Sequence, residues 1–521
     1  MKIVIIVMII LSVLVNLVGC GLKPATELPA EPEEPAIRLP IEESSEEPDE
    51  EPPPQAEPQS AGESPAAPRY VLTLSVTAGG ENEDAALTGT AEIAFTNTSA
   101  EAWEKLCLRD YMAANLEEAN HMMDPPAYTP GSIRSDRDGQ GNDLSFTADE
   151  DPSVVWVELP EPLEPGAAMT IAVDYETAIP AGGTRLCWFP AGDFSEGAKE
   201  TYGAKQVICL SQAYPVLAVY LEDGWNTAPY FTDGECFFSP CGNVTMELTL
   251  PEGYTAVSTG NEEQADGVWH LSAENVRDFG VIASNVYEVV TTQYQGVAIN
   301  SWYYAGADND RQQGEISLQA ALDAVAAFSE AWGVCPYDEL DVVETPYNYG
   351  GMEYPGMVRI SDSMAYRLDE EEALRLDVAH ETAHQWFYAA VGNDQYREAW
   401  LDESFAAYGE LVYLESLGAS EDEMAAKVAE KEGTLMEQYI NLPYGEYGDY
   451  TGYVQAVYKT GCVFLWELRE AMGQEAFDLF LRVWYEEHEF EEVTTKEFRE
   501  AAEAASGGSE TVTALLDQYL K

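Results

Sequence analysis

The chain carries the sequence His380-Glu381-Thr382-Ala383-His384 within a helical pattern of apolar residues that runs from about 370 to 390. Residues four apart on a helix differ by about 40° around the axis and by one turn in height, so His380 and His384 can bind one zinc ion from the same face. Glu381 lies to one side of this pair, where its carboxylate can act on a zinc-bound water. The pattern therefore predicts a helix that supplies a zinc centre and its general base.

A catalytic zinc site needs a third protein ligand and one open position. We expect Glu403 to be that ligand, because it follows His384 by 19 residues within Trp400-Leu401-Asp402-Glu403-Ser404-Phe405-Ala406, which predicts a second helix packed against the first. The alternative is a surface helix rich in Glu and Ala, but only five histidines occur in the chain and two of them fall here. The other three lack comparable partners and are expected to be ordinary surface or core residues: His121, His270 and His488.

The arrangement His380-Glu381-x-x-His384, eighteen further residues and Glu403 resembles the zinc signature of the gluzincin metallopeptidases, and within them of the M1 family of aminopeptidases. The block Leu401–Ala406 resembles that family's Leu-Asn-Glu-Gly-Phe-Ala. The resemblance implies one Zn²⁺ per chain, peptide substrates, and a hydrolase of the aminopeptidase N type.

A second block, Gly350-Gly351-Met352-Glu353-Tyr354, resembles the family's Gly-Ala-Met-Glu-Asn strand. The resemblance implies that Glu353 binds the free amino group of the substrate and that Gly351 and Met352 contribute to the substrate-binding strand. Tyr354 departs from the family's Asn. The alternative is an edge strand whose carboxylate is simply solvated.

Two further segments resemble family motifs. Tyr458-Lys459-Thr460-Gly461 is similar to Tyr-Glu-Lys-Gly, whose tyrosine donates to the oxyanion of the tetrahedral intermediate, so the resemblance gives this role to Tyr458. The alternatives are a packed core tyrosine at this position, or Tyr453 as the donor. Ser211-Gln212-Ala213 faintly resembles the segment that supplies a second contact to the substrate amine, which implies a substrate-binding role for Gln212.

The folded part divides by the period of its apolar residues. Residues 69–291 predict strands, as where Leu72, Leu74 and Val76 alternate with polar residues, and they favour an antiparallel sandwich or saddle. After Ser301 the spacing becomes helical at Leu318, Leu322, Val325, Phe328 and Trp332. We therefore expect a multidomain protein with a β-rich N-terminal domain.

The resemblance implies that this domain is followed by a thermolysin-like α+β catalytic domain at 292–440, with a helical C-terminal part at 441–521. Large family members continue into a long helical domain that closes over the site. Here the chain ends at Lys521, 63 residues after Tyr458, and we expect a more open cleft.

The first 20 residues are typical of a bacterial lipoprotein signal peptide. Lys2 leads into the apolar run 3–15, and Leu17-Val18-Gly19 precedes Cys20, the expected lipidated residue. Residues 21–68 are dense in Pro and Glu, which predicts a disordered stalk. We expect an extracytoplasmic protein held to a membrane by its lipid; the alternative is a simple anchor helix.

The composition excludes one class of partner. The formal net charge is −69, so a nucleic-acid binder with a general basic surface is excluded. The acidity indicates either a solubilised surface or attraction of cationic peptides.

Seven cysteines remain besides Cys20, and they cannot all pair within one chain. Cys236 and Cys241 flank a short turn, where a disulfide or two free thiols would fit. They lack a second pair at zinc-finger spacing.

These features together predict an extracytoplasmic zinc aminopeptidase of unspecified oligomeric state. Two other functions remain open. One is a zinc endopeptidase on the same scaffold, which an open cleft and Tyr354 would permit; the other is a surface lipoprotein that binds peptides without catalysis.

Overall fold

The computed structural model describes residues 67–79, 85–121, 128–129, 131–182, 185–189, 206–231, 234, 237–305, 310–347, 349–362, 371–432 and 438–521. All of them belong to one compact unit. None of the helices in these segments combines the length and apolar character needed to cross a bilayer. The signal peptide with Cys20, the stalk up to residue 66, and Cys236 lie outside the described residues, so the predictions made for them stay predictions.

The N-terminal half is built from antiparallel strands, as its alternating sequence predicts. In the first strand Leu72, Leu74 and Val76 are buried while Thr73 and Ser75 are exposed, which gives a sheet with one face on the core. The largest sheet has the order β15-β16-β13-β1-β2-β7-β4, with one parallel pair, β1 with β13. Its strands are β1 (Arg69–Thr77), β2 (Ala85–Thr96), β4 (Ile133–Asp138), β7 (Ala168–Ile179), β13 (Gly242–Thr249), β15 (Asn261–Ala265) and β16 (Val268–Val276).

Two four-stranded sheets and a short hairpin complete this half. The first sheet has the order β10-β3-β6-β5 and the second β14-β17-β9-β8, and α1 (Tyr111–His121) follows β3. The strands are β3 (Trp103–Arg109), β5 (Ser145–Ala148), β6 (Val154–Leu163), β8 (Leu186–Phe189), β9 (Val207–Leu210), β10 (Val216–Leu217), β11 (Tyr220–Leu221), β12 (Gly224–Trp225), β14 (Thr255–Ser258) and β17 (Val281–Ser284). Their inward side chains form one hydrophobic core.

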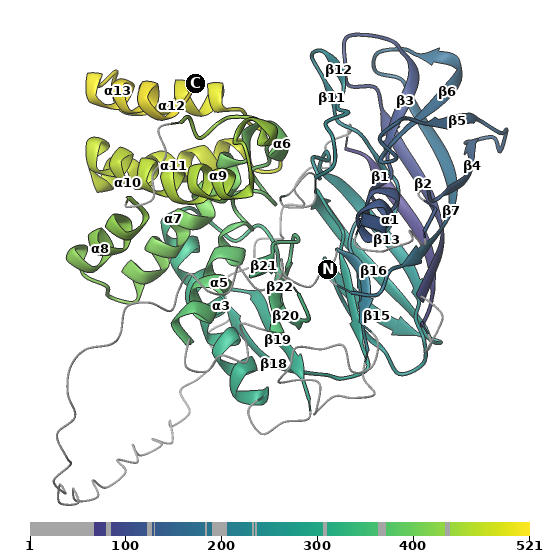
Figure 1. Ribbon diagram of the computed structural model, residues 1–521, viewed down its shortest axis with the longest axis horizontal. Helices are drawn as coiled ribbons and strands as arrows, with labels where there is room; N and C mark the ends of the chain where they lie inside the picture. The colour runs from purple at the N-terminus through teal and green to yellow at the C-terminus, as the bar shows by residue number, and fades with distance from the viewer. Residues whose placement is uncertain are drawn as a thin grey trace, which may run out of the picture. The chain divides into compact units, whose positions relative to one another are not determined.

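The second half of the chain begins with a five-stranded mixed sheet, in the order β18-β19-β20-β22-β21. The strands are β18 (Tyr287–Tyr294), β19 (Val297–Tyr304), β20 (Glu339–Thr345), β21 (Gly351–Met352) and β22 (Met357–Ser361). Helix α3 (Asp310–Ala331) is the crossover that the parallel pair β19–β20 requires. It packs with α5 (Glu371–Ala383) beside this sheet (Figure 1). Because β18 pairs with β19 along its whole length, the catalytic sheet begins within the segment that the sequence assigned to the N-terminal domain.

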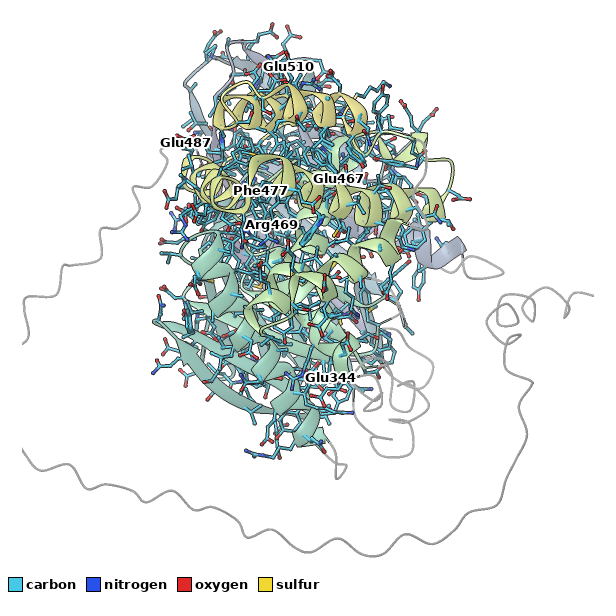
Figure 2. The ribbon with its side chains drawn as sticks, turned by 90° about the vertical axis from the view of Figure 1, so that its left-hand side faces the viewer. Glu344, Glu467, Arg469, Phe477, Glu487 and Glu510 are labelled. Carbon is cyan, nitrogen blue, oxygen red and sulfur yellow. The ribbon has the colours of Figure 1, made fainter. Side chains whose placement is uncertain are left out.

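The remaining chain is helical and packs around a second core. Its helices are α6 (Gln395–Glu398), α7 (Trp400–Ser416), α8 (Glu421–Glu432), α9 (Tyr450–Val454), α10 (Gly461–Met472), α11 (Gln474–His488), α12 (Thr495–Ala505) and α13 (Glu510–Tyr519), with a 3-10 turn at Tyr444–Glu446 and a π-helical segment at Gln455–Thr460. Arg469 on α10, Phe477 on α11 and Glu510 on α13 mark this region in Figure 2. Arg469 binds the carboxylate of Glu415 at 2.8 Å and so joins α10 to α7.

The predicted fold class is confirmed, but one helix is shorter than its pattern predicts. The expected helix at 370–390 ends at Ala383, which places His384 in the turn that follows. There the amides of Gln385 and Trp386 bond to carbonyls three residues back, and Tyr388 has a φ of 126°. The apolar pattern continues past residue 383 because these residues are buried, although they are no longer helical.

Candidate active site

The two histidines meet a carboxylate from the neighbouring helix. Nε2 of His380 lies 3.3 Å, and Nε2 of His384 3.4 Å, from the same oxygen, Oε2 of Glu403. Ligands about 2.1 Å from a tetrahedral metal lie about 3.4 Å from one another, so these spacings fit a zinc ion. Helix α5 begins with Glu371 and Glu372, which favour a helix N-terminus; its last turn carries His380, and His384 follows in the turn after the helix.

The Nδ1 atom of each histidine ring also has a hydrogen-bond partner. Nδ1 of His380 lies 3.1 Å from Oε1 of Glu410, and Nδ1 of His384 lies 3.1 Å from the carbonyl oxygen of Phe387. Outer partners of this kind fix the tautomer that leaves Nε2 free to bind metal. Sequence reasoning missed Glu410, although its place seven residues after Glu403 puts both on one face of α7.

The Glu403 carboxylate is held in its ionised form. Burial alone would raise its pKa, but hydrogen bonding and charge from His380 and His384 bring the pKa below its ordinary value. An ionised carboxylate beside two imidazoles suits a divalent cation, and the described residues therefore fit the zinc ligand set expected from the sequence.

Glu381 lines the same cavity, and its carboxylate lies next to Gly351 of strand β21. Burial, with a contribution from the charge of Glu353, raises the pKa of Glu381 to about 8. A Cβ atom on Gly351 would lie 2.3 Å from Oε1 of Glu381, which is closer than atoms can approach. With a side chain at position 351 of β21, the carboxylate end of Glu381 would have to shift from the place it occupies here.

Glu353 is only 3% exposed and lines the same cavity. A carboxylate oxygen of Glu353 lies within 4.8 Å of one from Glu381 and of a ring nitrogen of His384. Burial raises the pKa of Glu353, and its Oε1 has no hydrogen-bond partner among the described residues. A buried acceptor without a donor costs free energy, so a donor from a bound molecule fits here.

The neighbours of Glu353 in the motif turn away from the cavity. Met352 is 1% exposed and packs in the hydrophobic core of the β-rich half, so only its backbone is available to a substrate. The hydroxyl of Tyr354 shares a hydrogen bond with that of Ser211. The departure from the family's Asn therefore places a tyrosine in the core, outside the lining of the cavity.

Gln212 is buried and is not among the described residues that line the cavity. Its amide donates to the carboxylate of Asp278, and the charge of Glu353 acts on Asp278 in turn. The structure thus places Gln212 against Asp278, and its contact with a substrate stays a prediction.

Tyr458 reaches the cavity from the π-helical segment. Its phenol donates a hydrogen bond to Oε1 of Glu403, and its ring lies parallel to that of His380 with centroids 5.9 Å apart. Tyr453 is 1% exposed, packs in the core and does not line the cavity. A single π-helical turn often occurs at functional sites, because the extra residue redirects a side chain.

These side chains surround a cavity of about 370 Å³. Five carboxylates line it, from Glu353, Asp377, Glu381, Glu403 and Glu410, together with the cation of Arg185. Asp377 precedes His380 by one helical turn, a signal that sequence reasoning overlooked. Arg185 comes from the β-rich half, where no motif marked it.

The remaining histidines and cysteines lie elsewhere. His270 is 3.9 Å from Glu247 and His488 is 3.7 Å from Glu491, neither beside the cavity, and the side chain of His121 is outside the described residues. The described part of the chain holds six cysteines, and none of them forms a disulfide with another described cysteine: Cys107, Cys187, Cys209, Cys241, Cys335 and Cys462. The sequence left open whether Cys236 and Cys241 pair or stay thiols, and this stays open because Cys236 is not described.

Comparisons with known proteins agree with this geometry. The model of the peptidase family M1 domain matches residues 318–519. Aminopeptidase N of Streptomyces lividans is 25% identical over 308 residues, which cover 52% of this chain and 34% of the relative. Aminopeptidase B of Mus musculus is 23% identical over 61% of this chain and 48% of the relative. The chain thus covers a third to a half of the length of these relatives.

A solved structure covers more of the chain. The M1 zinc metallopeptidase from Deinococcus radiodurans has a TM-score of 0.60 and 19% identity, over 88% of this chain and 94% of that one. At this identity the likeness shows the fold. The fold is that of an M1 zinc metallopeptidase, and the site has the donor set of a zinc centre. Residues 318–519 match the peptidase family M1 domain and the two sequence relatives are aminopeptidases, which agrees with the resemblance to an aminopeptidase N-like M1 protein and with the prediction of a zinc cofactor.

Proposed function

We propose that this protein is an aminopeptidase that removes the N-terminal residue from peptides outside the cytoplasm. The observation that carries the proposal is the buried Oε1 of Glu353, which has no hydrogen-bond partner among the described residues and lies in the same cavity as Glu381 and the two histidines. A carboxylate in that position accepts the N-terminal ammonium of a peptide and restricts cleavage to the first peptide bond.

The metal would be held by His380, His384 and Glu403. When bound there, zinc supplies a Lewis acid that polarises the scissile carbonyl and increases the acidity of water. Glu381 takes the proton of the attacking water and gives it to the leaving amine, a role that its place in the cavity beside the two histidines suits. Tyr458 donates a hydrogen bond to the oxygen on which negative charge develops.

A panel of aminoacyl fluorogenic amides, compared with their N-acetylated counterparts, tests this proposal. We expect cleavage of the free-amine substrates alone, loss of activity with a chelator, and recovery on adding Zn²⁺. Cleavage of the acetylated set would identify an endopeptidase instead. No cleavage of either set would favour a protein that binds peptides without catalysis.

We also propose that the protein is anchored to a membrane through a lipid on Cys20. The support is the apolar run and small residues that precede this cysteine. In cells, Cys20→Ala should move the protein from the membrane fraction to the soluble fraction. Mass spectrometry of the mature N-terminus should find a lipidated Cys20 in the unchanged protein, and an unmodified terminus would contradict the proposal.

A further inference from the structure

One carboxylate of the cavity has no part in the proposed mechanism. Glu353, Glu381 and Glu403 have the roles given above, and Glu410 binds His380 and Lys431. Asp377 also lines the cavity, and its buried Oδ2 has no hydrogen-bond partner among the described residues. An acceptor of this kind indicates a donor that comes with a ligand.

The position of Asp377 follows from the two elements that meet there. It precedes His380 by three residues on α5, so both side chains lie on one face of the helix. A Cβ atom on Gly350, which also lines the cavity, would lie 3.5 Å from Oδ2 of Asp377, an ordinary contact distance. Asp377 therefore faces the chain just before β21, and α5 and β21 are neighbours in the fold (Figure 1).

The segment 350–353 runs along the cavity from Glu353, the proposed amine anchor. Gly351 lies next to Glu381, and Gly350 lies next to Asp377. At about 3.3 Å per residue of extended chain, Gly350 lies roughly 10 Å from Glu353. A peptide with its amine at Glu353 and its first peptide bond beside Glu381 would bring its second residue toward Asp377.

The described lining of the cavity favours a cationic ligand, because five carboxylates line it together with one arginine, Arg185. Lys431 is paired with Glu410 at 3.3 Å. The rings of Tyr349 and Tyr450 line the same cavity and offer apolar surface to a long side chain.

We propose that Asp377 recognises a lysine or arginine at the second residue of the substrate, the residue that becomes the new N-terminus after cleavage. The inference rests on the proposed aminopeptidase function and names its substrate class. A carboxylate pairs with either cation through charge-assisted hydrogen bonds, and with arginine in a bidentate manner.

The test uses peptides that differ only in their second residue: Ala-Lys, Ala-Arg, Ala-Ala and Ala-Glu followed by one common sequence. We expect kcat/KM to be about 10-fold higher for the Lys and Arg peptides than for the Ala peptide, and lowest for Glu. In Asp377→Asn the preference for Lys and Arg over Ala should fall at least about fivefold, and Asp377→Lys should favour Glu. Glu372→Gln removes a charge from the exposed side of α5 and should leave all ratios unchanged.

Two results would overturn the inference, and they differ in what else they contradict. Equal rates for the Lys, Arg and Ala peptides, with free-amine substrates still cleaved, contradict the role of Asp377 alone. The same holds if Asp377→Asn keeps the preference. If no free-amine substrate is cleaved, the proposed function fails and this inference fails with it.

Discussion

The phenol of Tyr458 donates its hydrogen bond to Oε1 of Glu403, while Oε2 of the same carboxylate faces the two histidines. One carboxylate thus joins the proposed oxyanion donor to the metal ligands. The residues that are proposed to bind zinc and those that are proposed to stabilise the transition state are therefore oriented together.

Tyr458→Phe separates these two contributions. It keeps the ring beside His380 but removes the donor, so we expect kcat to fall about 100- to 1,000-fold. Zinc affinity should change much less, because all three ligands remain. Steady-state kinetics and zinc titration by calorimetry measure the two effects. A variant with unchanged kcat would contradict the role of Tyr458.

Glu381→Gln removes the proposed general base and keeps the size of the side chain. We expect turnover to fall about 100- to 10,000-fold. Bound zinc, measured by elemental analysis, should stay at one ion per chain. Full activity in this variant would reject the assignment of Glu381.

Glu410→Ala removes the acceptor that orients His380. We expect zinc affinity to fall about 10- to 100-fold, because outer partners set the orientation and basicity of a histidine ligand. Competition with a chromogenic chelator measures this affinity. Glu421→Ala, at the exposed start of α8, is the matched loss of charge and should have no effect. Equal affinity in both variants would show that the Glu410 contact is dispensable.

Gly351→Ala tests the close approach of β21 to α5. The new methyl group would meet Oε1 of Glu381 at 2.3 Å and displace it, and we expect kcat/KM to fall about 100-fold. Gly350→Ala is the control, because its Cβ would meet Asp377 at 3.5 Å, an ordinary contact. Circular dichroism should find both variants folded. If both lose activity equally, the explanation by contact with Glu381 is wrong.

A carboxylate cluster between β15 and β20 predicts a pH dependence of stability. Carboxylate oxygens of Glu262, Glu339 and Asp341 lie within 4.8 Å of one another, and burial raises the pKa of Glu262 to about 7. Between about pH 4.5 and 7 the folded state then holds a proton that the unfolded state has lost, so stability falls as pH rises through this window.

Glu262→Gln should flatten this slope and raise the melting temperature at pH 8 by on the order of 1 to 2 °C. Glu263→Gln, the exposed neighbour on β15, should leave the slope unchanged. Differential scanning fluorimetry between pH 5 and 8 compares the three proteins. A slope that survives in Glu262→Gln would place its origin elsewhere.

The sequence predicted the parts of this protein that depend on local spacing. Residues four apart on a helix share a face wherever that helix lies, so His380 and His384 indicated a metal site without any knowledge of the fold. The alternation of Leu72, Leu74 and Val76 predicted a half-buried strand for the same reason. Glu403 follows from the spacing of the ligands and from the family resemblance.

Tertiary structure decided which distant residues meet the predicted site. Glu410 is 30 residues from His380, and Arg185 comes from another half of the chain. Packing also ended α5 at Ala383, turned Tyr354 toward Ser211, and placed Gln212 against Asp278. The periodicity of apolar residues is a property of one helix or strand, whereas these contacts depend on how several elements pack. Only the folded chain therefore shows that Asp377 lines the cavity and that its Oδ2 has no hydrogen-bond partner in the described structure.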